Sequence, residues 1–186
     1  MLTDNEQIVK AFNKFFTTIV SNSNASKIEC ANFIFQHFRE IKNNFLQTKT
    51  EFNLPEINND ITEDNLREIS ADSSPGISNI PSKILMRAKS KFIPILTTLF
   101  NECIKSSYIP SEWKCAVVTP LFKNKGDKSD PNNYRGISVL SPIAKLFQKI
   151  IAQQISSFFE NNNILFDGQH VFRHGRSCET ALHEII

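Results

Sequence analysis

The 186-residue chain has no apolar run long enough to cross a membrane and no secretory signal at its start. Its longest apolar patch is FIPILTTLF (92–100), whereas a membrane-spanning helix needs about 20 apolar residues. The opening MLTDNEQIVKAF carries acidic residues where a signal peptide would have a basic start followed by an apolar run. We therefore expect no membrane partner and an intracellular location, in the cytoplasm, the nucleus or both.

The sequence also lacks paired cysteines. Its four cysteines show no C-x-x-C spacing, so neither a structural zinc motif nor a disulfide framework is indicated. Free thiols in a reducing compartment are the expectation.

A strong excess of one charge is missing too, because 21 Lys and Arg face 19 Asp and Glu. The distribution is nevertheless uneven, since residues 114–149 hold seven Lys or Arg against two Asp. Such a local surplus can attract a polyanion, or it can be an ordinary solvated face. Charge alone leaves both readings open.

Apolar residues recur at helical spacing in the first part of the chain. Residues 5–20 place six apolar side chains on one stripe, and a second helix is expected around 28–46. FNLPEINND (52–60) then has the turn-forming residues typical of a linker. Residues 1–60 are therefore predicted to be a helical leader and linker.

Further helices are expected between residues 61 and 105. Thr62 is a candidate N-cap for a short helix, because a threonine hydroxyl can accept a hydrogen bond from a free backbone N–H of the first turn. SSPGISNIP (73–81) has the composition of a loop. Helical spacing resumes at Ser82 and is expected to restart at Pro94.

Residues 115–140 predict an antiparallel hairpin, with strands 115–122 and 134–140 around the turn-rich loop NKGDKSDPNN. Ser141 and Pro142 predict the N-cap and first residue of a long helix, and Ser177 is a candidate cap for a last helix. The predicted fold class is α+β, mostly helical, with one small antiparallel β-hairpin packed on helices.

A longer pattern runs through the second half of the chain. It reads YIPSEWKCAVVTPLFKNKGDKSDPNNYRGISVLSPIAKLFQKIIAQQISSFFENNNILFDGQHVFRHGRSCETAL. This segment resembles the N-terminal part of reverse transcriptases from non-LTR retrotransposons, with the Jockey- and CR1-like branches most similar. The resemblance implies that residues 61–186 are a partial reverse transcriptase domain, comprising the fingers and the start of the palm of a right-hand polymerase.

By this resemblance the hairpin closes on the incoming nucleotide. Lys123, Lys125 and Arg135 would bind the dNTP triphosphate, while Asn132, Asn133 and Tyr134 are expected to shape the turn. Cations suit this role, because Arg offers a planar fork of donors and Lys a point charge to phosphate oxygens. Without the resemblance, the same cations fit a solvated face equally well.

The segment QHVFRHGRS (169–177) resembles the part of the family that lies near the template strand. Gln169, Arg173 and Arg176 are the implied template-binding residues, and Phe172 is expected to enter the core. This loop and the hairpin are predicted to form one concave phosphate-binding surface.

The chain departs from the family pattern at two places. Val171 stands where the family usually has glycine, and a β-branched residue resists a positive φ. Ser78 and Asn79 stand where Asp-Gly is usual, and Asn tolerates the left-handed region.

The catalytic chemistry of the family is not expected in this chain. Related polymerases hold paired metal ions with palm aspartates, whereas this sequence has no Asp-Asp pair. The resemblance therefore implies a fragment without catalytic residues and without a cofactor of its own, with Mg²⁺ expected only in the complete polymerase. There, an RNA or DNA template-primer and dNTP would be the partners.

The sequence allows three other interpretations. His170, His174, Cys178 and His183 have spacings that resemble a zinc site, but Gly168 and Gly175 would break a helix through the histidines, so no metal is expected. A non-catalytic nucleic-acid-binding or regulatory module derived from a retroelement is the main alternative function. A plain helical scaffold is the third interpretation.

Overall fold

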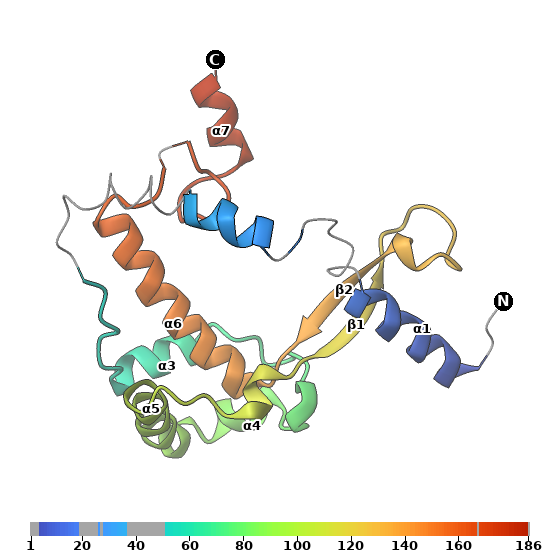
Figure 1. Ribbon diagram of the computed structural model, residues 1–186. Helices are drawn as coiled ribbons and strands as arrows, with labels where there is room; N and C mark the ends of the chain where they lie inside the picture. The colour runs from blue at the N-terminus through green and yellow to red at the C-terminus, as the bar shows by residue number, and fades with distance from the viewer. Residues whose placement is uncertain (1–3, 19–25, 27, 37–50, 167, 186) are drawn as a thin grey trace. The chain divides into compact units, whose positions relative to one another are not determined.

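The computed structural model describes residues 4–18, 26, 28–36, 51–166 and 168–185 (Figure 1). The chain divides into two compact units, each of which is described by itself. The hairpin unit comprises residues 1–49 and 116–139, and the helical unit comprises residues 50–115 and 140–186.

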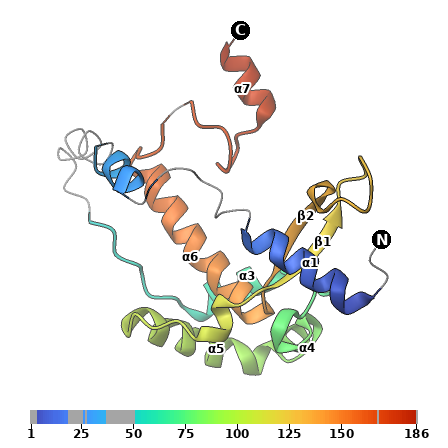
Figure 2. The same ribbon diagram turned by 45° about the vertical axis from the view of Figure 1, so that its right-hand side comes forward.

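In the helical unit α3 packs against both α5 and α6 (Figure 2). Its core contains a cluster of three aromatic rings, Phe100, Trp113 and Phe147, with centroids 5.1 to 5.8 Å apart. Branched aliphatic side chains such as Leu66 and Ile150 complete the core. The helices of this unit are α3 (Asn59–Arg67), α4 (Ser82–Arg87), α5 (Lys89–Lys105), α6 (Pro142–Asn161) and α7 (Cys178–Ile185), with 3₁₀ turns at Gly76–Ser78 and Ser111–Lys114.

Helix α3 begins earlier than the sequence predicted, and Thr62 is not its cap. Asn58 is the N-cap, and its side chain accepts a hydrogen bond from the backbone N–H of Ile61. Thr62 lies inside the helix, fully buried, with its hydroxyl 2.7 Å from that of Thr97 on α5. The cap prediction was wrong because Thr62 belongs to the face that packs on another helix, which local sequence does not reveal.

Helix α5 continues through Pro94 instead of restarting there. A proline inside a helix removes one backbone donor and crowds the preceding turn. Here it stands in the second turn of a helix whose far side is held by the buried side chains of Ile93, Leu96 and Phe100. Packing of that face therefore outweighs the local signal to stop.

Two other helix starts are confirmed. The Ser141 hydroxyl accepts from the N–H of Ala144 at the start of α6, and Pro142 occupies the first helical position. Ser177 and Thr180 cap α7 reciprocally, since each side chain accepts a hydrogen bond from the backbone N–H of the other. Asn79 takes φ 55°, as expected of an asparagine at that position.

The segment predicted as a linker contributes to the core. Ile57 is buried, and its backbone N–H and C=O both bond to the side-chain amide of Asn101 on α5, at 2.9 and 2.8 Å. The proposed boundary near residue 60 stays a prediction, and residue 57 packs with the helices that follow it.

The hairpin unit contains α1 (Asn5–Thr18), a helix at residues 28–36 and the strands β1 (Val117–Phe122) and β2 (Tyr134–Val139). The rest of the predicted 28–46 helix lies outside the described residues. The strands pair antiparallel, with Val117 opposite Val139 and Phe122 opposite Tyr134. The mostly helical α+β class with a small antiparallel sheet is thus confirmed.

No helix among the described residues has both the length and the apolar character that a membrane span requires.

Candidate nucleotide and nucleic-acid interface

The two faces of the hairpin differ in what covers them. On one face Tyr134 meets the ring of Phe12 from α1 edge-on, with centroids 4.8 Å apart. Tyr134 also packs against Phe122, its cross-strand partner. Helix α1 therefore covers this face of the hairpin (Figure 1).

The predicted nucleotide-binding residues Lys123 and Arg135 project from the opposite face. Arg135 follows Tyr134 and pairs with Leu121, and alternate residues of a strand point to opposite sides. The pairing continues past β1, because the Lys123 N–H donates to the Asn133 carbonyl at 2.8 Å. Lys123 and Arg135 are therefore diagonal neighbours across the two arms of the hairpin. Both residues are exposed.

The loop that joins the strands is held by its own polar residues. Asp127 accepts from the N–H of Ser129 at 2.9 Å, and Asp130 accepts from the N–H of Asn132 at the start of the 3₁₀ turn Pro131–Asn133. The Asn133 side chain donates to the Asp127 carbonyl, and the Tyr134 hydroxyl donates to the Lys128 carbonyl. The prediction that Asn132, Asn133 and Tyr134 shape the turn is confirmed.

These hydrogen bonds have an electrostatic consequence. The backbone N–H of Ser129, and then its side chain, lower the pKa of Asp127 below its ordinary value. Asp127 is thus ionised at neutral pH while it holds the loop, and the loop carries both signs of charge.

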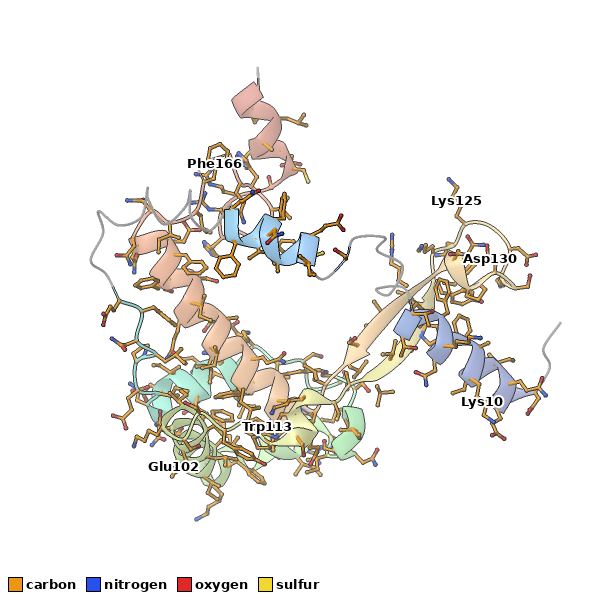
Figure 3. All side chains as sticks on the ribbon, in the orientation of Figure 1. Lys10, Glu102, Trp113, Lys125, Asp130 and Phe166 are labelled. Carbon is orange, nitrogen blue, oxygen red and sulfur yellow. The ribbon has the colours of Figure 1, made fainter. Side chains whose placement is uncertain are left out.

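The three predicted phosphate ligands are held to different degrees. The ammonium of Lys123 donates to the carbonyl of Asn132 at 2.7 Å, so it lies over the loop. Lys125 is exposed and extends from the loop near its tip (Figure 3). Lys128, which the sequence analysis did not single out, lies over the ring of Phe122 on the face that α1 covers, 5.7 Å from the centroid.

In the helical unit, Arg173 is tied to the end of α6. Its Nε and Nη2 donate to the two carboxylate oxygens of Glu160 at 2.9 and 2.7 Å, and Nη1 donates to the carbonyls of Phe166 and Gln169. The hydrogen bond from Arg173 is the main cause that lowers the pKa of Glu160. The Arg173 side chain is only 9% exposed, so it fastens the loop to the helix. Its role in template binding stays a prediction.

The other predicted template residues, Gln169 and Arg176, lie close in sequence to Arg173 and its ion pair with Glu160. Gln169 is exposed, whereas Arg176 is half-buried and its N–H approaches the Arg173 carbonyl at 3.4 Å. The hairpin and this loop belong to different units, so the single phosphate-binding surface predicted from them stays a prediction.

Phe172 does not enter the core, as the sequence had suggested, but is fully exposed. It also takes φ 60°, an unfavourable conformation for an aromatic residue. The left-handed backbone conformation is therefore taken by Phe172, and the β-branched Val171 before it does not have a positive φ. The clasp by Arg173 next in sequence fixes the loop in this shape.

His170 is accounted for by a contact within the helical unit. It is 7% exposed, and its Nδ1 lies 2.8 Å from the hydroxyl of Thr180 on α7. Within the described ranges no three His, Cys, Asp or Glu side chains lie together as a metal site would require.

No protein-family model matches the chain. Among curated proteins it is similar to RNA-directed DNA polymerases of non-LTR retrotransposons, and the resemblance noted in the sequence is thereby confirmed.

Several of these relatives come from Drosophila melanogaster. The chain is 28% identical over 120 residues to the "Probable RNA-directed DNA polymerase from transposon BS", a match that covers 64% of this chain. It is 30% identical over 117 residues, 63% of the chain, to the corresponding protein of transposon X-element. A third relative, the RNA-directed DNA polymerase from mobile element jockey of the same organism, is 20% identical over 113 residues, 61% of the chain. The chain spans only 12 to 13% of the length of these relatives.

Proposed function

We propose that this chain is the fingers portion of a non-LTR retrotransposon RNA-directed DNA polymerase, and that the exposed face of its hairpin binds the triphosphate of an incoming dNTP. The observation that carries the proposal is the register of the hairpin, which puts Lys123 and Arg135 on one face while α1 covers the other. Similarity to RNA-directed DNA polymerases supports the choice of nucleotide over other polyanions.

The arrangement suits a triphosphate chemically. A triphosphate presents several non-bridging oxygens, which a planar guanidinium and two ammonium groups can contact together. Lys123 gives up one neutral carbonyl contact to do so, and Lys125 approaches from the loop. Because the loop is held by Asp127, Asp130 and Asn133, its backbone needs little reordering on binding.

Template contacts in the proposal fall to Gln169 and Arg176, at the loop that Arg173 holds. Arg173 then acts as a positioning residue, since its guanidinium already donates to Glu160 and to two backbone carbonyls. RNA or DNA template-primer would be the partner in a complete enzyme.

Catalysis is not proposed for this chain by itself. It carries no Asp-Asp pair of the kind that holds two metal ions in such polymerases, so Mg²⁺ would be bound only in the complete protein. Primer extension by the purified chain with Mg²⁺ or Mn²⁺ is expected to give no product, and extension of the primer would contradict this assignment.

Nucleotide binding is tested by titrating the purified chain with dATP and with dAMP while hairpin amide resonances are followed by NMR. We expect Arg135→Ala and Lys123→Ala each to weaken dATP binding about tenfold, because each removes a charge-assisted hydrogen bond of about 1.4 kcal/mol. The matched controls Arg87→Ala and Lys91→Ala remove exposed cations of the helical unit and should leave binding unchanged.

The two remaining outcomes separate the alternatives. Salt-dependent RNA binding that falls in the Arg135→Ala variant, with no dATP binding, would favour the non-catalytic nucleic-acid-binding module. Equal affinities for all four variants and both ligands would leave the helical scaffold as the interpretation.

A further inference from the structure

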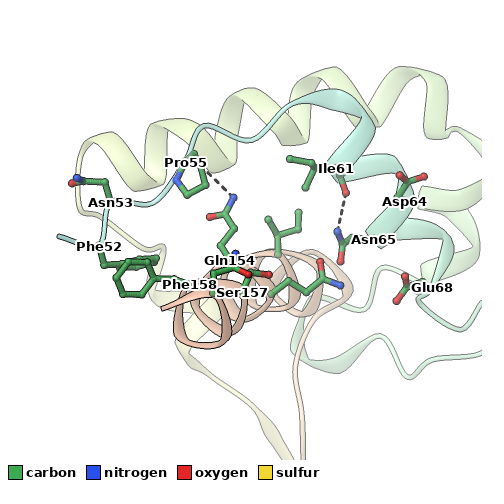
Figure 4. A pocket seen from close by; sticks show the side chains of 13 residues that line it. Phe52, Asn53, Pro55, Ile61, Asp64, Asn65, Glu68, Gln154, Ser157 and Phe158 are labelled. Carbon is green, nitrogen blue, oxygen red and sulfur yellow. Dashed lines mark hydrogen bonds between the residues drawn. The ribbon is translucent and has the colours of Figure 1, made fainter. Parts of the chain in front are cut away.

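The polar groups of the helical unit are largely used within it. A groove of about 560 Å³ lies between residues 52–55, α3 and α6 (Figure 4). Its carboxylates, Asp64 and Glu68, are already paired with Arg67 and Lys149. The outer edge of β2, in the hairpin unit, is different, because its backbone groups are exposed and unused.

The register of the hairpin fixes which backbone groups of β1 and β2 face each other. In an antiparallel pair, hydrogen bonds join directly opposite residues, and bonded pairs alternate with unbonded pairs. Lys123 and Asn133 are a bonded pair, since the Lys123 N–H donates to the Asn133 carbonyl at 2.8 Å. Backbone groups of the unbonded pairs point to the outer edges. These pairs are Phe122 with Tyr134, Pro120 with Gly136, and Val118 with Ser138.

The two outer edges differ in their capacity to pair with another strand. Pro120 stands in the middle of the β1 edge and has no backbone N–H, which blocks strand addition there. Gly136 stands opposite it on the β2 edge, without a side chain and exposed. Within the described ranges, no residue outside the strands hydrogen bonds to the backbone of Tyr134, Gly136 or Ser138. The β2 edge therefore offers a complete row of donors and acceptors.

Two side chains beside this edge determine what a third strand can bring. Arg135 and Ile137 point to the face that α1 leaves open, because they alternate with Tyr134 and Gly136, which α1 covers. Ile137 is 44% exposed. Arg135 is exposed, and its side chain makes no hydrogen bond or ion pair with the described residues. Since neighbouring side chains of adjacent strands interact, the first favours an apolar neighbour and the second a carboxylate.

We propose that the outer edge of β2 binds an extended acidic segment of another polypeptide by strand addition. The segment runs antiparallel to β2, the more stable pairing, and places a carboxylate beside Arg135 and an apolar side chain beside Ile137. Residues 116–139 hold four Lys or Arg against two Asp, so a second copy of the chain would be repelled. The proposal does not depend on dNTP binding, because it rests on the edge of the sheet and not on its face.

The test uses two capped pentapeptides of identical composition, Thr-Val-Thr-Glu-Thr and Thr-Glu-Thr-Val-Thr. With the central threonine opposite Gly136, the first peptide puts glutamate beside Arg135 and valine beside Ile137, and the second reverses both contacts. The backbone amide resonances of Tyr134, Gly136 and Ser138 are followed by NMR. We expect the first peptide to shift all three with a dissociation constant on the order of 1 mM. The second should bind about fivefold more weakly.

Methylation of the peptide backbone separates strand addition from binding by side chains alone. N-methylation of the central threonine removes the donor that faces Gly136 and should weaken the first peptide about tenfold. N-methylation of its glutamate blocks only an N–H that points away from β2, and should change the affinity by less than about twofold.

A matched pair of variants at one rung of the hairpin tests which edge is used. Ser138→Pro removes an outward donor of β2, whereas Val118→Pro makes the same change directly across the hairpin, on the β1 edge. Only Ser138→Pro should weaken the first peptide, by about fivefold. Both variants disturb the strands alike, so a general loss of the hairpin would appear in both.

A charge exchange tests the contact with Arg135. Arg135→Glu should weaken the first peptide about tenfold, and replacing the peptide's glutamate by lysine should restore the affinity, because the pair then keeps opposite charges. Arg87→Glu makes the same change of charge at an exposed position of the helical unit and should have no effect.

Four results would overturn the proposal. The first is no shift of the three amides at 10 mM peptide (on the order of ten times the expected dissociation constant). The second is an equal loss from methylation at the two peptide positions. The third is that the exchanged peptide binds as well as the first. The fourth is that the three amides shift with rising concentration of the chain alone, which would make a second copy the occupant.

Discussion

Two loops of this protein, residues 123–133 and 163–177, both carry Lys or Arg residues, but their internal hydrogen bonds are made in opposite ways. In the first loop Asp127, Asp130 and Asn133 make the internal hydrogen bonds, and the side chain of Arg135, next to the loop, makes no hydrogen bond or ion pair with the described residues. In the second loop the cation itself makes them, because Arg173 binds Glu160 and two backbone carbonyls. A count of lysines and arginines therefore does not tell which charges remain available to a ligand.

The largest expected effect is on the free energy of loop opening when a glycine in each loop is replaced by alanine. Gly126 has φ 83°, and an added Cβ would lie 2.5 Å from the Asn133 side chain, which donates to Asp127. Gly126→Ala should lower the free energy of opening of the hairpin loop by about 2 kcal/mol, from left-handed strain and the displaced Asn133. Hydrogen exchange at the Lys123 amide, which bonds to Asn133, measures it.

Gly175 is the matched control. Its φ is 71°, but an added Cβ would meet nothing within 4 Å. Gly175→Ala should therefore show only the left-handed penalty, about 1 kcal/mol. An equal effect at both sites would mean that Asn133 does not hold the first loop.

The second prediction concerns the cations themselves. Arg173→Ala should lower the unfolding midpoint of the chain by about 3 °C, because the loop after α6 loses its attachment. Arg135→Ala should shift the midpoint by less than about 1 °C, since the Arg135 side chain makes no hydrogen bond or ion pair with the described residues and the strand backbone is unchanged. Thermal unfolding followed by circular dichroism checks both, and a larger loss for Arg135→Ala would reverse the comparison.

The smallest expected effect is on pH dependence. The pKa of Glu160 is lowered by Arg173, so the stabilisation it provides is fully present above the ordinary carboxyl pKa of 4.5 and is lost as the pH falls through the lowered value. Asp127 behaves in the same way, with the Ser129 backbone as the cause. Carboxyl NMR titration should show that Arg173→Ala raises the pKa of Glu160 toward its ordinary value, because the largest cause of its lowering is removed, and leaves the pKa of Asp127 unchanged.

Local chemistry explains why parts of the fold could be predicted. The Ser141–Pro142 start of α6 and the Ser177 cap of α7 involve partners within three residues, and so do most hydrogen bonds of the hairpin loop. Such contacts are encoded by spacing alone. The order of the strands and the turn residues were predicted for the same reason.

The errors all involve partners distant in sequence. Thr62 forms a hydrogen bond with Thr97, 35 residues away. Helix α5 continues through Pro94 because its other face is packed in the core. The Arg173 clasp joins residues 13 apart and leaves Phe172 exposed. None of these pairings has a signal in the local pattern.

The candidate sites divide along the same line. The sequence alone determined the hairpin and the positions of its cations, because strand alternation and turn chemistry act over a few residues. The resemblance to retrotransposon polymerases was likewise visible in the sequence. Only the tertiary structure decided that α1 covers one face of the hairpin and that Arg173 holds the loop after α6. Those outcomes depend on which surfaces pack together, and packing between distant segments is set by the whole core.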